Sequence, residues 1–334
     1  MITGFLREAD SSLAVPRPEQ AMLAVNGLSW PHTERLTYTQ GDSVRWRWIN
    51  ATRVAHPMHL HGFYFHLESR GDWKSEQVYR KDERPFLVTN LMQPRETMRI
   101  GWLPERPGNW IFHCHFAFHV SQHLKLRADT GAPVAAPAAK LTSAASSPVA
   151  AHGSHARHHE MAGLVMGITV LPGKELERQT TTWSDARNIR LLVQSAPKRF
   201  GRLTGFGYVA QEGATEPTRD SILIPGPTIV LRRGQPARIT VVNRLAEPTA
   251  VHWHGIELQS FPDGVPGWSG SPGRIMPPIA PGDSFVAEFV PPRAGTFIYH
   301  AHHNEQLQLG AGLYGALLVV DDAIPTIRRS TGSW

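Results

Sequence analysis

Short segments in which apolar and polar residues alternate recur along most of the chain. In residues 43–49, Ser-Val-Arg-Trp-Arg-Trp-Ile, tryptophans alternate with arginines, a pattern typical of a strand with one buried face. A similar segment covers residues 35–39, and short segments separated by Gly and Pro turns continue to about residue 127 and again over about 180–322. Stretches with the period of a helix are almost absent. The pattern predicts an all-β protein.

The two halves of the chain repeat each other. Residues 41–50 align with residues 234–243, and a His-x-His pair follows each aligned segment after the same interval. Residues 107–113 likewise match residues 294–300. A repeat of this kind indicates two copies of one structural unit. Many short strands with Gly and Pro turns favour a Greek-key β-sandwich or barrel in each copy.

The 334 residues leave room for two domains of ordinary size. We expect an N-terminal tail at 1–20, a first domain at 21–172 and a second domain at 173–334. Residues 131–158, rich in Ala, Pro and His, are expected to form a flexible stretch within the first domain. Its last part begins a cluster of four histidines at 152–159, which fits either a solvated linker or an additional metal site.

Composition excludes several classes of protein. With 41% hydrophobic and 19% charged residues the chain is typical of a globular protein. No block of Lys and Arg with interleaved aromatic residues points to nucleic acid, so the net charge of +6 is interpreted as a solvation property. No apolar run approaches the roughly 20 residues that span a bilayer. The single cysteine excludes an intrachain disulfide.

That cysteine, Cys114, lies between His113 and His115, with His119 shortly after it. A thiolate among imidazoles makes a soft, nitrogen-rich site that suits copper. Because successive side chains of a strand point to opposite faces, His113 and His115 should project together, away from Cys114. The thiolate would then serve one copper while the two histidines serve others behind it.

Each half also carries two His-x-His pairs at equivalent positions of the repeat. On a strand both members of a pair point to one face, so two pairs on neighbouring strands place four imidazoles on one surface. Two such surfaces can enclose a multinuclear site. The eight histidines are His59, His61, His113 and His115 in the first half and His252, His254, His300 and His302 in the second.

The copies differ at a second set of positions. The first half has a residue set that suits a mononuclear copper, and all three members are replaced together in the second half, as a metal site predicts and core packing does not. Five residues beyond His119, where a weak axial methionine could lie, the chain has Leu124, which should raise the reduction potential. The three residues His56, Cys114 and His119 align with Thr249, Ala301 and Gln306.

These motifs resemble those of the multicopper oxidases, the laccase family. Residues 56–62, His-Pro-Met-His-Leu-His-Gly, and 113–119, His-Cys-His-x3-His, look like the C-terminal copper motifs of that family, while 252–255 and 300–302 look like its N-terminal ones. The resemblance covers about 21–322 and implies two cupredoxin-like domains. The motif order is reversed, as in two-domain laccases with the type 1 copper in the first domain. Such proteins assemble as homotrimers with trinuclear clusters between subunits, and a meeting of the two histidine surfaces within one chain through the long linker stays open as the alternative.

The resemblance also implies a role for each motif residue and four coppers per chain. Type 1 copper falls to His56, Cys114 and His119, and type 2 copper to His59 and His252. One type 3 copper takes His254, His300 and His115, and the other takes His302, His61 and His113. Asp263 lies where the family has an acid that assists proton delivery. A second acid found in some members just after the His-Cys-His motif is absent, because Phe116 and Ala117 occupy that region.

We therefore expect a laccase-like oxidase that takes single electrons from phenols or aromatic amines at type 1 copper, through His56 or His119, and passes them along Cys114, His113 and His115. Four electrons would reduce O2 to water at the trinuclear cluster. A copper nitrite reductase, a Cu(I) or Mn(II) oxidase and a copper-binding protein stay open as alternatives. We expect a bacterial-type periplasmic or secreted protein, although the first ten residues show no leader.

Overall fold

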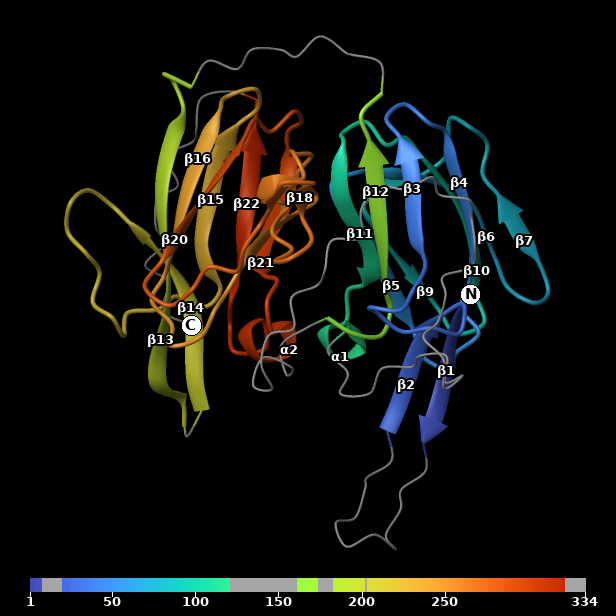
Figure 1. The fold of residues 1–334 in the computed structure, drawn as a ribbon, viewed down its shortest axis with the longest axis horizontal. Helices are drawn as coiled ribbons and strands as arrows, with labels where there is room; N and C mark the ends of the chain where they lie inside the picture. The colour runs from blue at the N-terminus through green and yellow to red at the C-terminus, as the bar shows by residue number, and fades with distance from the viewer. Residues whose placement is uncertain (8–19, 121–160, 174–182, 202, 322–334) are drawn as a thin grey trace, which may run out of the picture.

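The structure is a computed structural model that describes residues 1–7, 20–120, 161–173, 183–201 and 203–321. Its strands form two groups that lie side by side, the first half of the chain on the right in Figure 1 and the second half on the left. Helical elements in the described residues are short: α1 (Ala117–Val120), α2 (Glu305–Gln308) and the 3-10 turn η2 (Phe261–Asp263). The predicted all-β fold is confirmed, and no described helix has the length and apolarity to cross a membrane.

Two large sheets and the small sheet of β1 (Ile2–Arg7) and β2 (Gln20–Val25) make up the first half. One large sheet has the order β4 (Val44–Ile49), β10 (Thr97–Trp102), β6 (Phe65–Gly71) and β7 (Glu76–Val78), with β8 (Phe86–Leu87) also paired to β6. The other contains β11 (Gly108–Cys114), β12 (Val165–Leu171) and β3 (Arg35–Thr39), with β5 (His56–Leu60) on β11 and β9 (Thr89–Met92) on β5. Burial alternates along β4 and β10, as a sheet with one face on the core requires.

The second half repeats this arrangement. Its first sheet has the order β14 (Leu203–Gln211), β13 (Arg187–Phe200), β16 (Ala237–Asn243) and β20 (Ser284–Phe289). Its second sheet has the order β15 (Gly226–Arg232), β22 (Tyr314–Val320), β21 (Gly295–Ala301) and β17 (Val251–His254). Each half encloses its own cluster of buried apolar side chains. The expected domain boundary near 172–173 stays a prediction, since residues 174–182 lie outside the described part.

The expected N-terminal tail is wrong for residues 2–7. These residues form β1 (Ile2–Arg7), which pairs antiparallel with β2 (Gln20–Val25) over six residue pairs. The Ile2 side chain is fully buried in the core of the first half. This burial and the backbone pairing hold residues 2–7 against the first half. The remainder of the expected tail, and the stretch at 131–158, lie outside the described residues.

A segment of the second half joins a sheet of the first half. Strand β18 (Gly270–Ser271), paired with β19 (Arg274–Ile275), lies beside β11 through the pair Asn109 and Gly270. Next to it the Trp268 indole N–H donates to the carbonyl oxygen of Trp110 at 2.8 Å. Gly167 of β12 leaves room for the indole, because a Cβ there would lie 2.7 Å from a Trp268 ring carbon. The two halves therefore pack directly against each other along β11, the strand that ends at Cys114.

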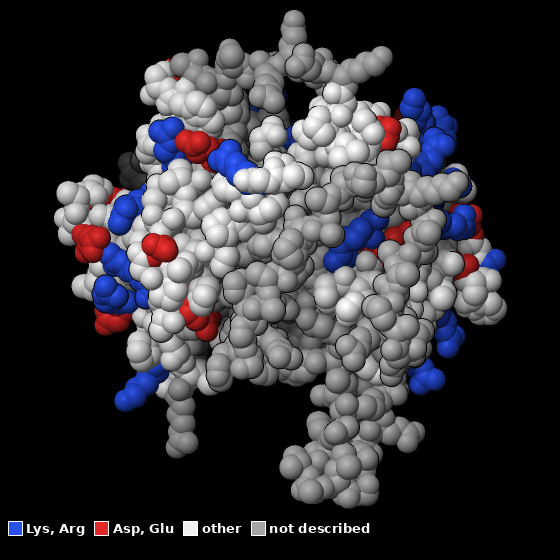
Figure 2. Space-filling view, in the orientation of Figure 1, with Lys and Arg blue, Asp and Glu red and all other residues white. Residues whose placement is uncertain are grey.

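Charged side chains are interspersed on the surface. On the face drawn in Figure 2, basic and acidic side chains lie next to one another along both flanks of the molecule. Ion pairs among exposed and partly exposed side chains include Arg47 with Glu76 and Arg238 with Glu288. This distribution agrees with the interpretation of the positive net charge as a solvation property.

Candidate metal centres

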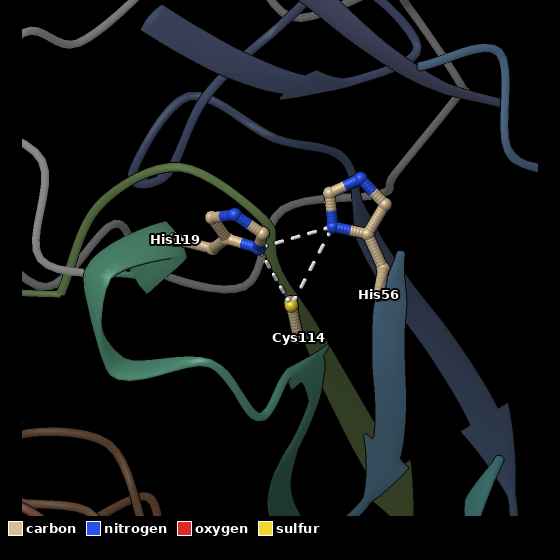
Figure 3. Close-up of side chains that lie close together, drawn as sticks. All are labelled: His56, Cys114 and His119. Atoms are coloured by element: carbon tan, nitrogen blue, oxygen red, sulfur yellow. Dashed lines mark hydrogen bonds between the residues drawn. The ribbon is translucent and has the colours of Figure 1, made fainter. Parts of the chain in front are cut away.

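The three residues of the predicted mononuclear site meet in the first half. His56 begins β5, Cys114 ends β11 and His119 lies on α1, and their side chains point toward one another (Figure 3). The Cys114 Sγ atom lies 3.6 Å from His56 Nδ1 and 3.3 Å from His119 Nδ1, and the two nitrogens are 3.1 Å apart. All three residues are buried. One sulfur and two imidazole nitrogens facing a common point form a trigonal donor set that suits copper.

The outer nitrogens of the two imidazoles have different surroundings. His56 Nε2 lies 2.8 Å from the Thr52 hydroxyl oxygen, and Thr52 is itself hydrogen-bonded to the buried Asn50 side chain. The ring of His119 instead contacts Phe118, with centroids 4.3 Å apart, and Phe116 lies parallel to Phe118. These two phenylalanines are 58% and 37% exposed. His119 is thus the ligand candidate that lies next to exposed aromatic side chains.

All eight histidines of the four His-x-His pairs meet between the two halves. Three contacts between ring nitrogens lie in this cluster, two between the halves and one within the first half. His59 Nε2 lies 3.4 Å from His252 Nε2, and His115 Nε2 lies 3.3 Å from His300 Nε2. His61 Nε2 lies 2.9 Å from His113 Nε2. Five of these histidines lie on β5, β11, β17 and β21, and His61, His115 and His302 each directly follow the last residue of a strand.

The cluster divides into groups that could each hold a metal ion. Nitrogen atoms of His61, His113 and His302 lie within 4.8 Å of one another, which is the trio expected for one type 3 copper. In the second expected trio the ring centroid of His115 lies 4.6 Å from that of His254 and 5.0 Å from that of His300, and the His254 and His300 centroids are 5.9 Å apart. His59 and His252, the expected type 2 pair, form a further group with His61. The assignment of each copper stays a prediction.

In five of these histidines the Nδ1 atom contacts a backbone or side-chain oxygen. The Nε2 atom of each ring is then the one available to a metal in the cluster. Such contacts fix the tautomer and orientation of a metal-binding histidine. The partners are Val88 O for His59 Nδ1 at 2.8 Å, Cys114 O for His113 at 2.9 Å, Ala301 O for His300 at 2.9 Å, Asp263 O for His252 at 2.6 Å and Asp263 Oδ2 for His61 at 2.8 Å.

Asp263 lies at the end of η2 and is fully buried. Its Oδ2 atom accepts hydrogen bonds from His61 Nδ1 and, at 3.3 Å, from the Ser269 hydroxyl. The following Gly264 has φ of 106°, and a Cβ there would collide with the backbone of Val251, so this turn requires glycine. Burial raises the pKa of Asp263 to about 8, against its hydrogen bond from Ser269. The carboxyl therefore holds its proton at neutral pH.

Burial sets the protonation of the candidate ligands. It lowers the pKa of all ten histidines, to about 4 for His56 and His119 and to about 3 for His254. These imidazoles are neutral at pH 7, the form that binds metals. Burial raises the pKa of the Cys114 thiol to about 12, so a metal that binds sulfur there displaces a proton.

The cluster contains buried polar atoms that lack hydrogen-bond partners among the described residues. They include both ring nitrogens of His302, Oδ1 of Asp263 and Oε1 of Glu305. A buried imidazole nitrogen without a partner costs free energy unless a bound group satisfies it. A copper ion satisfies such a nitrogen, and neutral imidazoles with one thiolate are the donors that copper prefers. The residues present fit copper at both sites.

The two histidine surfaces that meet belong to one chain. The resemblance implied surfaces from neighbouring subunits, with a meeting inside one chain as the alternative, and the described chain has the second arrangement. Interactions between the halves include His59 with His252 and His61 with Asp263. The homotrimer itself stays a prediction.

Two features of the site were missed in the sequence. The residue that faces Thr249, the counterpart of His56, is Gln308, whose Oε1 accepts from the Thr249 hydroxyl at 2.8 Å. Gln306, predicted for this place, is exposed, because the segment after Ala301 reaches its helix through extra residues. The second is Glu305, a buried acid 3.3 Å from His302 Nδ1. Its only sequence signal is an acid three residues after a histidine pair. Leu124 and the histidines of 152–159 lie outside the described residues.

Comparisons with known proteins agree with this chemistry. Two family models, both described as multicopper oxidase, match residues 8–132 and 222–324. Multicopper oxidase MCE of Talaromyces pinophilus is 43% identical over 106 residues, which cover 30% of this chain and 16% of that protein. Laccase 1 of Metarhizium acridum (strain CQMa 102) is 40% identical over 94 residues, covering 28% of this chain and 14% of that protein.

Copper resistance protein A of Escherichia coli is 40% identical over 96 residues, covering 29% of this chain and 14% of that protein. The matched region thus spans less than a fifth of the length of each of these relatives. Among solved structures, a multi-copper oxidase from Pseudomonas thermotolerans has 29% sequence identity and a TM-score of 0.34, covering 43% of this chain and 31% of that one. Because the two family models match the segments that carry both histidine surfaces, the chain belongs to the multicopper oxidase family.

Proposed function

We propose that the protein is a laccase-like oxidase that couples the one-electron oxidation of phenols or aromatic amines to the four-electron reduction of O2 to water. The observation that carries this proposal is the adjacency of two candidate copper sites. Cys114 belongs to one site, while its neighbours His113 and His115 belong to the other. Bound at these sites, copper would supply one-electron chemistry at the first and O2 reduction at the second.

The residues that would hold four coppers per chain are assigned from the resemblance, and the grouping of donor atoms supports part of the assignment. Type 1 copper is assigned to His56, Cys114 and His119, whose donor atoms lie within 4.8 Å of one another. Type 2 copper is assigned to His59 and His252. The type 3 pair is assigned to His61, His113 and His302 for one ion and to His115, His254 and His300 for the other.

The surroundings of His119 support aromatic reductants. The outer nitrogen of His56 contacts Thr52, whereas the ring of His119 contacts Phe118. Exposed Phe116 and Phe118 offer a flat apolar surface, and aromatic rings pack favourably on such surfaces. We assign His119 as the ligand through which reductants deliver electrons, and the covalent link from Cys114 to His113 and His115 as the path inward.

Asp263 is assigned as a proton donor to the histidine cluster. It carries a proton at neutral pH, and its Oδ1 has no hydrogen-bond partner among the described residues. The reduction of O2 to water consumes protons in a site whose histidines are buried and neutral. A protonated carboxyl beside His61 and His252 holds one proton where it is consumed.

A metal-ion oxidase is the second candidate, because one relative is named copper resistance protein A. A nitrite reductase needs only two coppers and so has no use for both of the pairs His113/His115 and His300/His302. A copper-binding protein would bind copper without consuming oxygen. Comparing the oxidation of 2,6-dimethoxyphenol with that of Cu(I) and Mn(II) separates the two oxidases.

The test is to load the protein with copper, count copper per chain and record visible and near-UV absorption with O2 uptake. We expect about four coppers, an intense blue band, a near-UV shoulder and one O2 consumed per four molecules of 2,6-dimethoxyphenol. Two coppers without the near-UV shoulder favour the nitrite reductase, and four coppers without turnover favour copper storage. Absence of a blue band contradicts the role of Cys114.

We also propose that the chain forms a homotrimer and is exported. The resemblance to two-domain laccases supports both statements. Light scattering on the copper-loaded protein measures the mass, and a monomer would contradict the trimer.

A further inference from the structure

Glu305 lies beside the histidine cluster without a role in the function proposed above. It begins α2, is only 5% exposed and lies where α2 approaches α1 between the two halves (Figure 1). Its Oε1 atom lies 3.3 Å from Nδ1 of His302 and has no hydrogen-bond partner among the described residues. A buried carboxylate oxygen without a partner is costly, so its position next to an imidazole needs an explanation.

His302 differs from the histidines around it. His59, His61, His113, His252 and His300 each have Nδ1 held by a carbonyl or carboxylate oxygen. Neither ring nitrogen of His302 has a hydrogen bond. Its nitrogen nevertheless groups with those of His61 and His113 in a potential metal site. Glu305 lies next to Nδ1 of His302, as Asp263 lies next to Nδ1 of His61 and orients that ring.

The helix that carries Glu305 is anchored by another residue. Gln308 of α2 accepts a hydrogen bond from Thr249 and donates to Glu247 and to the carbonyl oxygen of Pro248. Because these contacts fix the helix, Glu305 is not needed to hold α2 in place. Its carboxylate is free to serve the cluster.

We propose that Glu305 is a positioning residue, whose carboxylate accepts a hydrogen bond from His302 Nδ1–H and so directs His302 Nε2 toward a copper shared with His61 and His113. At 3.3 Å the two atoms do not form a hydrogen bond as they stand, and a small rotation of the Glu305 side chain would complete one. A metal-binding histidine commonly donates its second N–H to a carboxylate, and loss of that partner weakens metal binding about 10–100-fold. The inference rests on the proposed copper sites.

The test compares Glu305→Leu, Glu305→Gln and the control Gln306→Leu, which changes the same helix at an exposed residue and leaves the Gln308 anchor intact. Each copper-loaded protein is dialysed against a graded chelator. Copper per chain, the near-UV absorption of the histidine cluster and the blue absorption of the Cys114 site are then measured.

We expect Glu305→Leu to lose cluster copper at about 10–100-fold lower chelator concentration while the blue band persists. Glu305→Gln should retain copper nearly as the unchanged protein does, because the amide oxygen still accepts from Nδ1–H. Wild-type copper retention in Glu305→Leu, equal losses in Glu305→Gln, or equal losses in Gln306→Leu would each overturn the proposal. Failure of the unchanged protein to show the blue band and four coppers would instead contradict the proposed function.

Discussion

Asp263, from the second half of the chain, accepts a hydrogen bond from Nδ1 of His61, from the first half, at 2.8 Å. The same residue accepts from His252 through its backbone oxygen at 2.6 Å. One buried residue therefore orients imidazoles of both halves, and its own carboxyl is protonated at neutral pH. Asp263 thus orients two histidines of the cluster and also holds a proton beside them.

Replacing Asp263 by Asn should separate these two roles. Asn keeps an oxygen that can accept from His61 but carries no transferable proton. We expect copper per chain to stay near the unchanged value and kcat for O2 consumption to fall about 10²–10⁴-fold, the usual contribution of a general acid. Ser269→Ala, which removes only the hydroxyl bonded to Asp263 Oδ2, is the control and should lower kcat far less. If Asp263→Asn kept the kcat of the unchanged protein, Asp263 would not be a proton donor in O2 reduction.

The copper-free protein should have its greatest stability near pH 6.5. Ten histidines have pKa values lowered by burial, so the unfolded chain binds more protons and unfolding becomes more favourable as pH falls from about 6.5 to about 4. Burial raises the pKa of Asp263 to about 8 and of Glu305 to about 7, so their contribution is lost as pH rises through these values.

Urea unfolding of the copper-free protein between pH 4.5 and 8.5 measures this dependence. The midpoint should fall steeply on the acid side, where ten groups act, and gently on the alkaline side, where two act. A midpoint that rises toward pH 4.5 would mean that these histidines are not neutral in the folded chain.

The pattern of strand residues was sufficient to place the candidate ligands. Alternation along a strand predicts that Cys114 faces away from His113 and His115, and the structure places Cys114 with His119 and the two histidines in the other cluster. The repeat identifies the equivalent positions of the second half. Both inferences depend on local geometry, which a sequence specifies well.

Contacts between distant segments were harder to predict. The alignment of His119 with Gln306 is wrong by two residues, because loop length after Ala301 is not encoded in any periodic pattern. Nothing near residue 270 indicates that β18 pairs with β11, since a two-residue strand has no alternation to detect. Residues 2–7 contain no turn signal that would mark them as a strand with a distant partner.

Trp268→Ala should weaken the contact between the halves without affecting the Cys114 site. The indole donates to the carbonyl oxygen of Trp110 and packs edge-on against Trp30 at 5.3 Å. Complete loss of a buried aromatic side chain costs about 3–5 kcal/mol, and Trp268 is only partly buried, so we expect about 2–3 kcal/mol. The near-UV signal should fall while the blue band stays. Trp73→Ala, at an exposed position, is the control. If the near-UV absorption of the histidine cluster and the blue band of the Cys114 site fell together, the prediction that Trp268 supports only the contact between the halves would be wrong.

Phe118→Ala should impair phenol oxidation but spare a small inorganic reductant. An aromatic contact contributes about 0.5–1.5 kcal/mol beyond its buried area, which corresponds to roughly 2–10-fold in kcat/KM for 2,6-dimethoxyphenol. Ferrocyanide has no ring to pack on Phe118, so its oxidation should change less. Equal losses with both reductants would indicate that the change disturbs His119, which Phe118 contacts, instead of substrate binding.

Mixing two inactive variants should show whether one chain suffices for the cluster. The first variant, His59→Ala with His61→Ala, lacks ligands of the first half, and the second, His252→Ala with His254→Ala, lacks those of the second half. In the structure His59 meets His252 of its own chain. If this holds in solution, every mixed assembly contains only incomplete clusters, and copper-loaded mixtures refolded together from urea should consume no O2. A cluster built between neighbouring subunits would restore intact sites wherever the two unaltered surfaces meet. The activity of the mixture would then follow the product of the fractions of the two variants, with a maximum at equal amounts. Recovery of that kind would show that the second half of each chain pairs with the first half of its neighbour.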